Sequence, residues 1–202
     1  MAQLYVIIIA MSILEKAVEV LQKGGVIAHA TDTCYGFAAD IFNKDAVEKV
    51  YELKQMARSK PVSILVSSLE EAQKFGRFNE SALELAKKHW PGALTIIVRR
   101  TEQLPQWINP EDQTVGIRLP GDEISRGLAS RLGRPITTTS ANITTQPSPY
   151  SVAVIQEQFA GSPLQPDFYL DSGTLASTNP PSTIVDCTVE PPKVIRQGGL
   201  RV

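Results

Sequence analysis

Hydrophobic and polar positions follow two different periods along the first part of the chain. The apolar run Leu4 to Ile9 is too short to span a membrane and predicts a strand. Ser12-Ile-Leu-Glu15 has the sequence of a helix capping box, and the helical spacing of the apolar residues after it predicts a helix that ends at Gly24-Gly25. The next apolar segment, Val26 to His29, predicts a second strand.

The second predicted helix places a lysine where the chain changes direction. This helix begins near Asn43, carries apolar residues on one face, and has Lys54 at its C-terminal end, where a cation is favourable. Capping signals at Ser68 and Ser81 predict two further helices, and the Trp90-Pro91-Gly92 turn ends the second of them. Lys54 is therefore expected at a helix-to-strand junction.

The remaining elements are mostly strands. Buried strands are predicted at residues 62–66, 94–98, 115–119 and 136–139, helices at 123–132 and 152–159, and further strands at 168–170, 183–186 and 194–196. Strict alternation of strand and helix fails after Trp90, so we expect an α/β fold in which a twisted mixed β-sheet with flanking helices forms a single domain, residues 1–202. A doubly wound parallel sheet is the alternative.

Composition indicates a globular chain and limits the classes of function. Hydrophobic residues make up 43% and charged residues 20% of the 202 residues. A net charge of −1 gives no overall attraction for a polyanion, so nucleic-acid binding requires a local basic patch. Cys34 and Cys187 lack metal-ligand spacing, so neither a disulfide scaffold nor a zinc site is expected. The reducing cytoplasm is the expected location, without contact with a membrane.

A hydroxyl-rich segment, Thr31-Asp32-Thr33-Cys34-Tyr35-Gly36, follows a predicted strand and suits a loop that binds a polar ligand. A simple Ser/Thr turn, with Gly36 relieving backbone strain, is an equally weighted alternative. Cys34 and His29 suggest a nucleophile and a base, but a strand points residues five apart to opposite faces. We therefore interpret Cys34 as a buried, inert cysteine and His29 as structural.

Cations and polar groups gather at two further junctions. Lys54, Arg58 and Lys60 place three cations within seven residues, a layout that can bind phosphates or carboxylates. A solvated basic loop is the alternative. The predicted strand at 136–139 leads into Ser140-Ala141-Asn142, and strand ends of this kind commonly hold ligands.

Two arginines lie within apolar stretches, Arg118 and Arg196, and both are predicted to be buried. A buried arginine needs an anionic partner. Asp32 or Asp186 could supply it about as readily as a ligand, and the presence of two such arginines favours a ligand. The sequence contains no P-loop, GxGxxG, GxSxG or HExxH motif. A nucleotide or a hydrolysed substrate would therefore have to be bound without the standard motifs for nucleotide binding and hydrolysis.

Several segments, taken in order, resemble those of the YrdC-like family, the threonylcarbamoyl-adenylate synthases of tRNA modification. They are Thr31-Asp-Thr-Cys-Tyr-Gly36, Lys54, Trp90-Pro-Gly-Ala-Leu-Thr95, Val115-Gly-Ile-Arg-Leu-Pro120, Ser140-Ala-Asn142, Pro147-Ser-Pro149, Ser182-Thr-Ile-Val-Asp186 and Ile195-Arg-Gln-Gly198. The matches run from about residue 12 to residue 199 in the family's order, and their collinear combination is more informative than any one of them.

The resemblance implies a twisted mixed sheet that encloses a basic cavity. In that cavity ATP, L-threonine and bicarbonate become threonylcarbamoyl-AMP and pyrophosphate, with Mg²⁺ expected on the ATP. A downstream threonylcarbamoyl-transferase machinery then modifies adenosine 37 of certain tRNAs. Because the carbamate of threonine attacks the α-phosphate, no covalent enzyme nucleophile is needed, and the protein acts by positioning two anionic reactants among cations.

The resemblance also assigns roles to single residues. The positions that match threonine contacts are Thr33, Arg118, Thr138 and Ser182. The expected nucleotide-binding residues are Lys54, Arg58, Lys60, Thr114, Ser140, Asn142, Ser148 and Arg196, of which Arg58 and Lys60 are added as neighbouring cations. Lys54, Ser140 and Asn142 are the expected catalytic residues, and no protein ligand to a metal is expected.

The chain departs from the family pattern at the Lys-x-Arg signature, whose arginine is Met56 here. A thioether cannot stabilise a transferring phosphate, so Arg58 or Lys60 would have to compensate through a shifted loop. Leu65 and Ala30 also replace a histidine and a proline that are usual in the family. Such losses resemble the YciO-like branch. The first alternative is therefore a YciO-like paralogue that binds or hydrolyses an adenylate without synthesis, and the second is a module that binds double-stranded RNA or tRNA.

Overall fold

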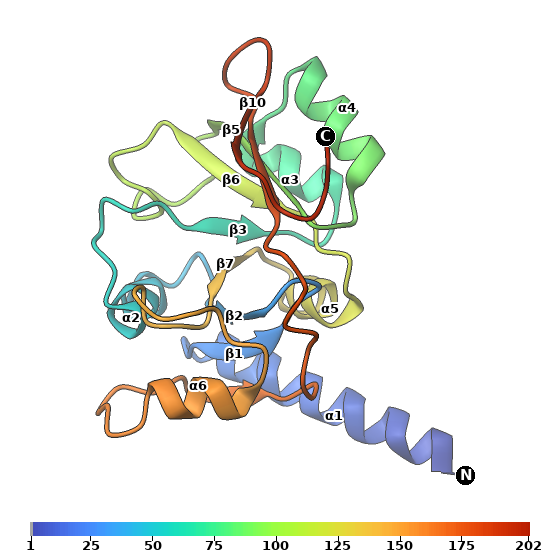
Figure 1. Cartoon of the computed structure of the whole chain (residues 1–202), viewed down its shortest axis with the longest axis vertical. Coiled ribbons are helices and arrows are strands. Elements are labelled where there is room, and N and C mark those ends of the chain that lie inside the picture. Colours follow the sequence, from blue (N-terminus) through green and yellow to red (C-terminus); the bar gives the residue numbers. More distant parts are fainter. Residues whose placement is uncertain (1) are drawn as a thin grey trace.

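The described part of the chain, residues 2–202 with side chains from residue 12 onward, forms helices and a large mixed sheet in this computed structural model (Figure 1). The helices are α1 (Ala2–Gln22), α2 (Lys44–Lys54), α3 (Leu69–Phe75), α4 (Glu80–His89), α5 (Glu123–Leu132) and α6 (Val152–Gln158). The strands are β1 (Ile27–Ala30), β2 (Tyr35–Ala38), β3 (Ser63–Leu65), β4 (Gly76–Arg77), β5 (Leu94–Arg100), β6 (Thr114–Arg118), β7 (Ile136–Ser140), β8 (Phe168–Leu170), β9 (Thr183–Asp186) and β10 (Lys193–Arg196).

The strands form a sheet in the order β10-β9-β5-β6-β3-β7-β2-β1-β8, with β4 paired to β5. Pairing is parallel for β1 with β8, β3 with β6 and β5 with β9, and the other neighbours are antiparallel. The prediction of a mixed α/β sheet is therefore confirmed, and the doubly wound parallel alternative is wrong. Mixed pairing brings chain segments that are distant in sequence to neighbouring strand ends.

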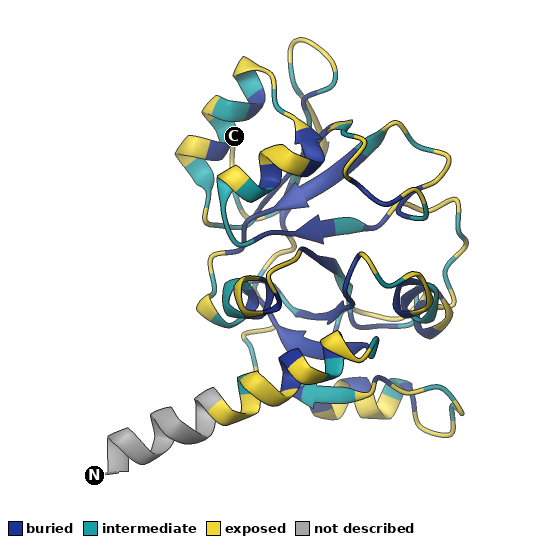
Figure 2. Ribbon diagram, turned by 180° about the vertical axis from the view of Figure 1, so that it is seen from behind, coloured by how far each residue is buried: buried dark blue, intermediate teal, exposed yellow. Residues whose placement is uncertain are grey.

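Helices cover both faces of the sheet. In Figure 1, α2 and α5 lie on opposite sides of β7 and β2, with α6 near α2 and α1 near α5. The strands between them are buried, whereas the outer sides of the helices are exposed (Figure 2). The core consists of three apolar clusters. One lies between α2 and α6 and includes Leu53, Ile155 and Phe159. The second lies between α1 and α5 and includes Leu21, Leu128 and Leu65, and the third lies beside α3 and α4 and includes Ile96, Ile117 and Phe75.

The N-terminal prediction is wrong in one respect. The segment Leu4 to Ile9 belongs to α1 and not to a strand, and α1 begins at Ala2 and not at Ser12. A short, uniformly apolar run carries no period of its own, so it can continue the helix whose 3.6-residue pattern follows. The predicted end of this helix before Gly24 is confirmed, because α1 ends at Gln22. No helix of the described chain is both long and apolar enough to cross a membrane.

Two strands were not predicted, and one helix cap lies elsewhere. The segment Tyr35–Ala38 forms β2, which pairs with β1 across the short turn that the amide of Thr31 closes by donating to the Cys34 carbonyl at 3.1 Å. The two-residue strand β4 was also missed. Helix α4 is capped by the Asn79 side chain, two residues before Ser81. The hydroxyl-rich segment is therefore the tip of a β-hairpin.

Candidate functional site

A cavity of about 230 Å³ lies over one face of the sheet. Its lining residues are Thr31, Thr33, Cys34, Gly36, Pro61, Val62, Ser63, Thr95, Arg118, Thr138, Thr139, Ser140, Ser148, Pro181, Ser182, Ile184 and Arg196. This lining contains two arginines and many hydroxyl groups, and none of these residues carries a carboxylate. The lining therefore suits a polar, anionic ligand.

The floor of the cavity follows from the strand register. Gly36 pairs with Ser140, Ser63 pairs with Thr138, and Arg118 pairs with Thr95, so small or hydroxylated residues of β2, β7, β3 and β5 and the arginine of β6 lie near one another. Leu65 and Ile136, which pair with each other two residues along the same strands, point to the same face as Ser63 and Thr138 and belong to the apolar cluster between α1 and α5. The cavity therefore continues this face of the sheet where apolar residues give way to polar ones near the end of β7.

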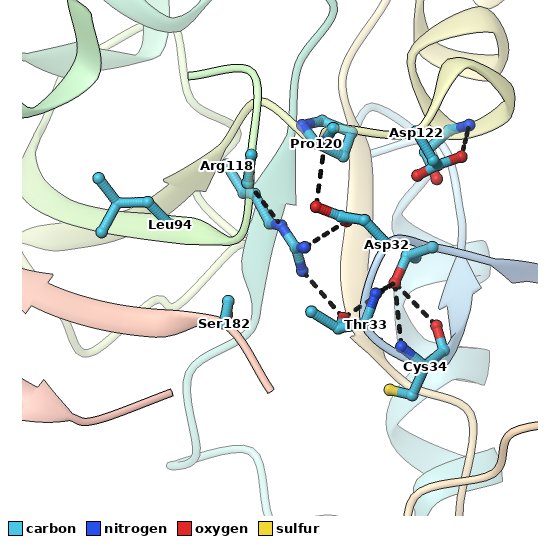
Figure 3. A network of polar contacts seen from close by, with 12 residues as sticks. Asp32, Thr33, Cys34, Leu94, Arg118, Pro120, Asp122 and Ser182 are labelled. Carbon is cyan, nitrogen blue, oxygen red and sulfur yellow. Dashed lines mark hydrogen bonds and ion pairs between the residues drawn. The ribbon is translucent and has the colours of Figure 1, made fainter. Parts of the chain in front are cut away.

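The guanidinium of Arg118 forms one end of the cavity. Its Nη2 forms an ion pair with Asp32, its Nη1 donates to Thr33 Oγ1 at 3.3 Å, and its Nε donates to the Gly92 carbonyl at 3.4 Å. Figure 3 shows the guanidinium held between Asp32 and Thr33. Arg118 is buried, as predicted, and its anionic partner is the protein carboxylate Asp32.

Arg196 lies in the cavity on the edge strand β10. Its Nη2 donates to the Ser182 carbonyl at 2.9 Å and to Ser182 Oγ at 3.0 Å, and Thr95 Oγ1 lies 3.0 Å from the same hydroxyl. The prediction that Arg196 is buried is wrong, because an edge strand leaves all four residues of β10 exposed. The loss of water around its guanidinium end, and secondly the charge of Arg118, lower the pKa of Arg196.

Lys54 ends α2 and points its ammonium at the loop after β7. Nζ lies 2.6 Å from the Ser140 carbonyl, 3.1 Å from the Asn142 carbonyl and 3.2 Å from Asn142 Oδ1. These oxygens are neutral, and no ion pair joins Lys54 to a carboxylate in the described part of the chain. Burial lowers the pKa of Lys54 to about 8, and the nearby thiol of Cys34 partly opposes this shift. Lys54 is thus a buried cation without a counter-ion.

Ser140 and Asn142 are fixed by this lysine and by each other. Ser140 Oγ donates to Asn142 Oδ1 at 2.5 Å, and Asn142 Nδ2 donates to the Ile143 carbonyl at 2.9 Å. Ser140 lines the cavity, whereas Lys54 and Asn142 lie outside the lining and hold the loop in place. The structure thus brings together the three residues that the family resemblance gives as catalytic.

Cys34 lines the cavity and is partly exposed, so the prediction of a buried cysteine is wrong. Burial still raises the pKa of its thiol, although the charge of Arg118 and hydrogen bonds with Thr33 and Ser148 act in the opposite direction. His29 is fully buried, and its Nδ1 lies 3.0 Å from the Ala30 carbonyl. The thiol and the imidazole therefore form no nucleophile and base pair.

Besides Lys54 and Asn142, three further residues expected at the site lie outside the cavity lining. Arg58 pairs with Glu48 and stacks over Tyr51, with its guanidinium carbon 4.1 Å from the ring centre. Lys60 is exposed, and Thr114 lies at the other end of β6 from Arg118. The basic segment 54–60 therefore does not gather around the cavity.

Three residues around the cavity were not among the predicted site residues, although two of them lie in the hydroxyl-rich segment 31–36 and Asp32 was one of the two carboxylates considered as a partner for a buried arginine. Thr31 and Thr95 both line the cavity, and Asp32 fixes Arg118 from outside the lining. The sequence feature that could have identified Thr31 and Thr95 is a hydroxyl group just after the end of β1 and another near the start of β5. Met56, which takes the place of the family's arginine, packs against the apolar cluster beside α3 and α4.

Comparison with known proteins places the chain in a family. The Sua5/YciO/YrdC family model, described as telomere recombination, matches residues 19–198, and the chain belongs to this family. Threonylcarbamoyl-AMP synthase of Pyrococcus abyssi is 34% identical over 89% of this chain, which spans only 52% of that relative.

Two solved structures share the fold. Pyrococcus abyssi Sua5 complexed with L-threonine superposes with a TM-score of 0.86 at 33% identity, covering 93% of this chain and 54% of that one. Escherichia coli YciO superposes with a TM-score of 0.82 at 28% identity, covering 92% of this chain and 89% of that one. The family thus includes relatives named as synthases as well as YciO.

Proposed function

We propose that this protein is an L-threonylcarbamoyladenylate synthase. It would make threonylcarbamoyl-AMP and pyrophosphate from L-threonine, bicarbonate and ATP for the modification of tRNA at position 37. The name of the Pyrococcus abyssi relative, and the L-threonine in the Sua5 complex, support this assignment. Within the cell we expect the protein to act in the cytoplasm and to pass its product to a threonylcarbamoyl-transferase machinery.

The observation that carries the proposal is the uncompensated charge at the cavity. The guanidinium of Arg196 bonds only Ser182 among the described residues, and Lys54 is buried against neutral oxygens behind Ser140. A buried cation that lacks a counter-ion is costly in the free protein, so an anionic ligand beside it is favoured. The phosphates of a nucleotide fit this end of the cavity.

The residues divide into two groups in this proposal. Thr33, Arg118, Thr138 and Ser182 bind L-threonine, with the remaining N–H groups of Arg118 directed to its carboxylate. Ser140, Ser148 and Arg196 contact the nucleotide, while Lys54 and Asn142 hold Ser140 and supply positive charge. Thr114, Arg58 and Lys60 lie outside the cavity lining, and we assign them no role.

The chemistry needs positioning and charge and does not need a nucleophilic side chain. The neutral amine of threonine attacks the carbon of carbon dioxide derived from bicarbonate and loses a proton, which gives a carbamate. An oxygen of that carbamate then attacks the α-phosphate of ATP, and pyrophosphate leaves. Both reactants are anionic, so the cations Arg196 and Lys54 act by offsetting their repulsion in the transition state.

Magnesium is expected with ATP, and the residues present do not form a dedicated site for it. None of the cavity-lining residues carries a carboxylate, and no cluster of three or more potential metal ligands occurs in the described part of the chain. Magnesium would therefore be held by phosphate oxygens and water. We derive no catalytic step from it.

A second candidate function is the binding or hydrolysis of an adenylate without synthesis. Met56, which takes the place of the family signature's arginine, is partly buried against an apolar cluster, and Arg58 is engaged by Glu48 and Tyr51. One cation fewer would then face the phosphates. The similarity to Escherichia coli YciO supports the same reading.

The release of pyrophosphate tests the two candidates. Purified protein with ATP, magnesium, L-threonine and bicarbonate should release pyrophosphate, and omission of L-threonine or bicarbonate should abolish the signal. Ser140→Ala should lower the rate at least about tenfold, because it removes a hydroxyl beside the reacting phosphate. Thr144→Ser, which keeps the hydroxyl that bonds the Lys54 carbonyl, is the control and should retain the rate. Folded protein that binds AMP but releases no pyrophosphate would exclude the synthase.

A further inference from the structure

The two arginines of the cavity differ in their charge partners. Arg118 forms an ion pair with Asp32, and its side chain is only 6% exposed. Arg196 contacts the carbonyl and hydroxyl of Ser182 and has no carboxylate partner in the described part of the chain. Asp32 therefore balances the charge of Arg118, whereas no carboxylate of the described chain balances the charge of Arg196.

Asp32 is held at both of its oxygens. Oδ1 pairs with Arg118, and Oδ2 accepts from the Gly121 amide at 3.2 Å. A Cβ at Gly121 would lie 3.1 Å from that same oxygen, so the carboxylate is closely packed against the chain after β6. Because Asp32 is fixed in this way, its charge stays beside the guanidinium of Arg118.

We propose that Asp32 is a specificity-determining residue, which keeps the Arg118 end of the cavity neutral so that it takes a zwitterionic amino acid while phosphates bind at Arg196. This inference rests on the proposed function and extends it to a residue outside the cavity lining. Asp32 acts through Arg118 and does not itself contact the ligand.

The physical reason is the charge of the two kinds of ligand. An arginine without a partner attracts any anion, and it attracts a multiply charged phosphate more strongly than the single carboxylate of an amino acid. The Asp32 charge cancels this attraction at long range. At short range each terminal nitrogen of Arg118 keeps one N–H, because Thr33 and Asp32 each use one of its two. A carboxylate can still bind there, and the nearby negative charge of Asp32 favours the ammonium of the same ligand.

The test compares Asp32→Asn with wild type by calorimetry, using inorganic pyrophosphate and L-threonine as separate probes. Asparagine keeps the size of the side chain and removes its charge. We expect Asp32→Asn to bind pyrophosphate about tenfold more tightly and L-threonine about tenfold more weakly, since one unit charge changes at close range. Asp32→Glu, which retains the charge, should keep the wild-type preference. Glu111→Gln makes the same change in net charge at an exposed residue between β5 and β6 and should alter neither affinity.

Two outcomes would overturn the role of Asp32. One is an Asp32→Asn protein in which both affinities stay unchanged or fall together, and the other is an Asp32→Glu protein that behaves like Asp32→Asn. If Asp32→Asn does not fold, the test uses the wild-type protein. L-threonine should bind to wild type that is already saturated with pyrophosphate, and if the two ligands exclude each other, the proposal that they bind at different places in the cavity is refuted. The calorimetry contains no ATP or bicarbonate, so the change in pyrophosphate affinity can be measured even if the protein is not a synthase. If the protein is a synthase but Asp32→Asn does not change the pyrophosphate affinity, only the role of Asp32 is refuted.

Discussion

The buried ammonium of Lys54 makes the stability of the protein depend on pH in a definite direction. Burial lowers its pKa from 10.5 to about 8 in the folded state. Between these two values the unfolded chain binds more protons than the folded chain, so the free energy of unfolding rises with pH. From pH 7 to pH 9.5 this single group should add about 2 kcal/mol of stability, at about 1.4 kcal/mol for each unit of pKa difference.

Lys54→Met isolates this contribution, because methionine has similar length and no charge. Other groups titrate in the same window, among them Tyr35 and Cys34, whose pKa values are raised. Their effect is common to both proteins and cancels when the free energy of unfolding of wild type is compared with that of Lys54→Met. Urea unfolding of both proteins at pH 7, 8, 9 and 9.5 gives the required difference.

The difference in unfolding free energy should increase by about 2 kcal/mol in favour of wild type as the pH rises. Saturating AMP should reduce this increase, since an anion near Lys54 stabilises its charged form and raises its pKa. A difference that stays constant with pH would show that the pKa of Lys54 is close to its ordinary value. The account of Lys54 as an uncompensated buried cation would then be wrong.

Three further predictions follow from the same contacts. Arg196→Ala should raise the KM for ATP at least about tenfold, since a charged hydrogen bond to a phosphate is lost. The melting temperature should hardly change, because Arg196 is exposed on an edge strand. Phe159→Ala should lower the free energy of unfolding in urea by about 3–5 kcal/mol, since Phe159 is 2% exposed and packs edge-to-face on Phe37. Iodoacetamide should alkylate Cys34 more slowly at pH 7.5 than free cysteine, and AMP should slow it further; intact mass measured beside Cys34→Ser checks both.

The fold could be predicted well wherever a local pattern determines an element. The bounds of α5, β8 and β9 agree with prediction, because each has a clear period between turn or capping residues. Helix α1 and strand β2 were misassigned for opposite reasons. The apolar start of α1 has no period of its own. The four-residue strand β2 directly follows a hydroxyl-rich turn, so its sequence was interpreted as part of a loop, and it is stabilised by pairing with β1 and with β7, which is distant in sequence.

The sequence indicated which types of residue form the candidate site, but it did not show which of its cations are paired with a carboxylate or exposed. Lys54 meets Ser140 and Asn142 because the end of α2 and the end of β7 lie at neighbouring loops, and the sequence placed these residues at such ends. The exposure of Arg196 could not be read from its apolar neighbours, because the order of strands in the sheet puts β10 at an edge. The choice of Asp32 as the partner of Arg118 likewise depends on a long-range contact.

The replacement of the family's arginine by Met56 is important because few cations near the cavity lack a carboxylate partner. Arg118 is paired with Asp32 and Arg58 with Glu48, and Lys60 is exposed outside the cavity lining, so Arg196 and Lys54 are the cations that would act on the phosphates in the proposed reaction. ATP carries more negative charge than AMP, and each additional charge needs a cation nearby to offset its repulsion of the carbamate. If the cavity binds a nucleotide as proposed, the loss of one arginine should weaken the binding of ATP more than that of AMP. The ratio of these two affinities thus separates the synthase from an adenylate-binding relative even before turnover is measured.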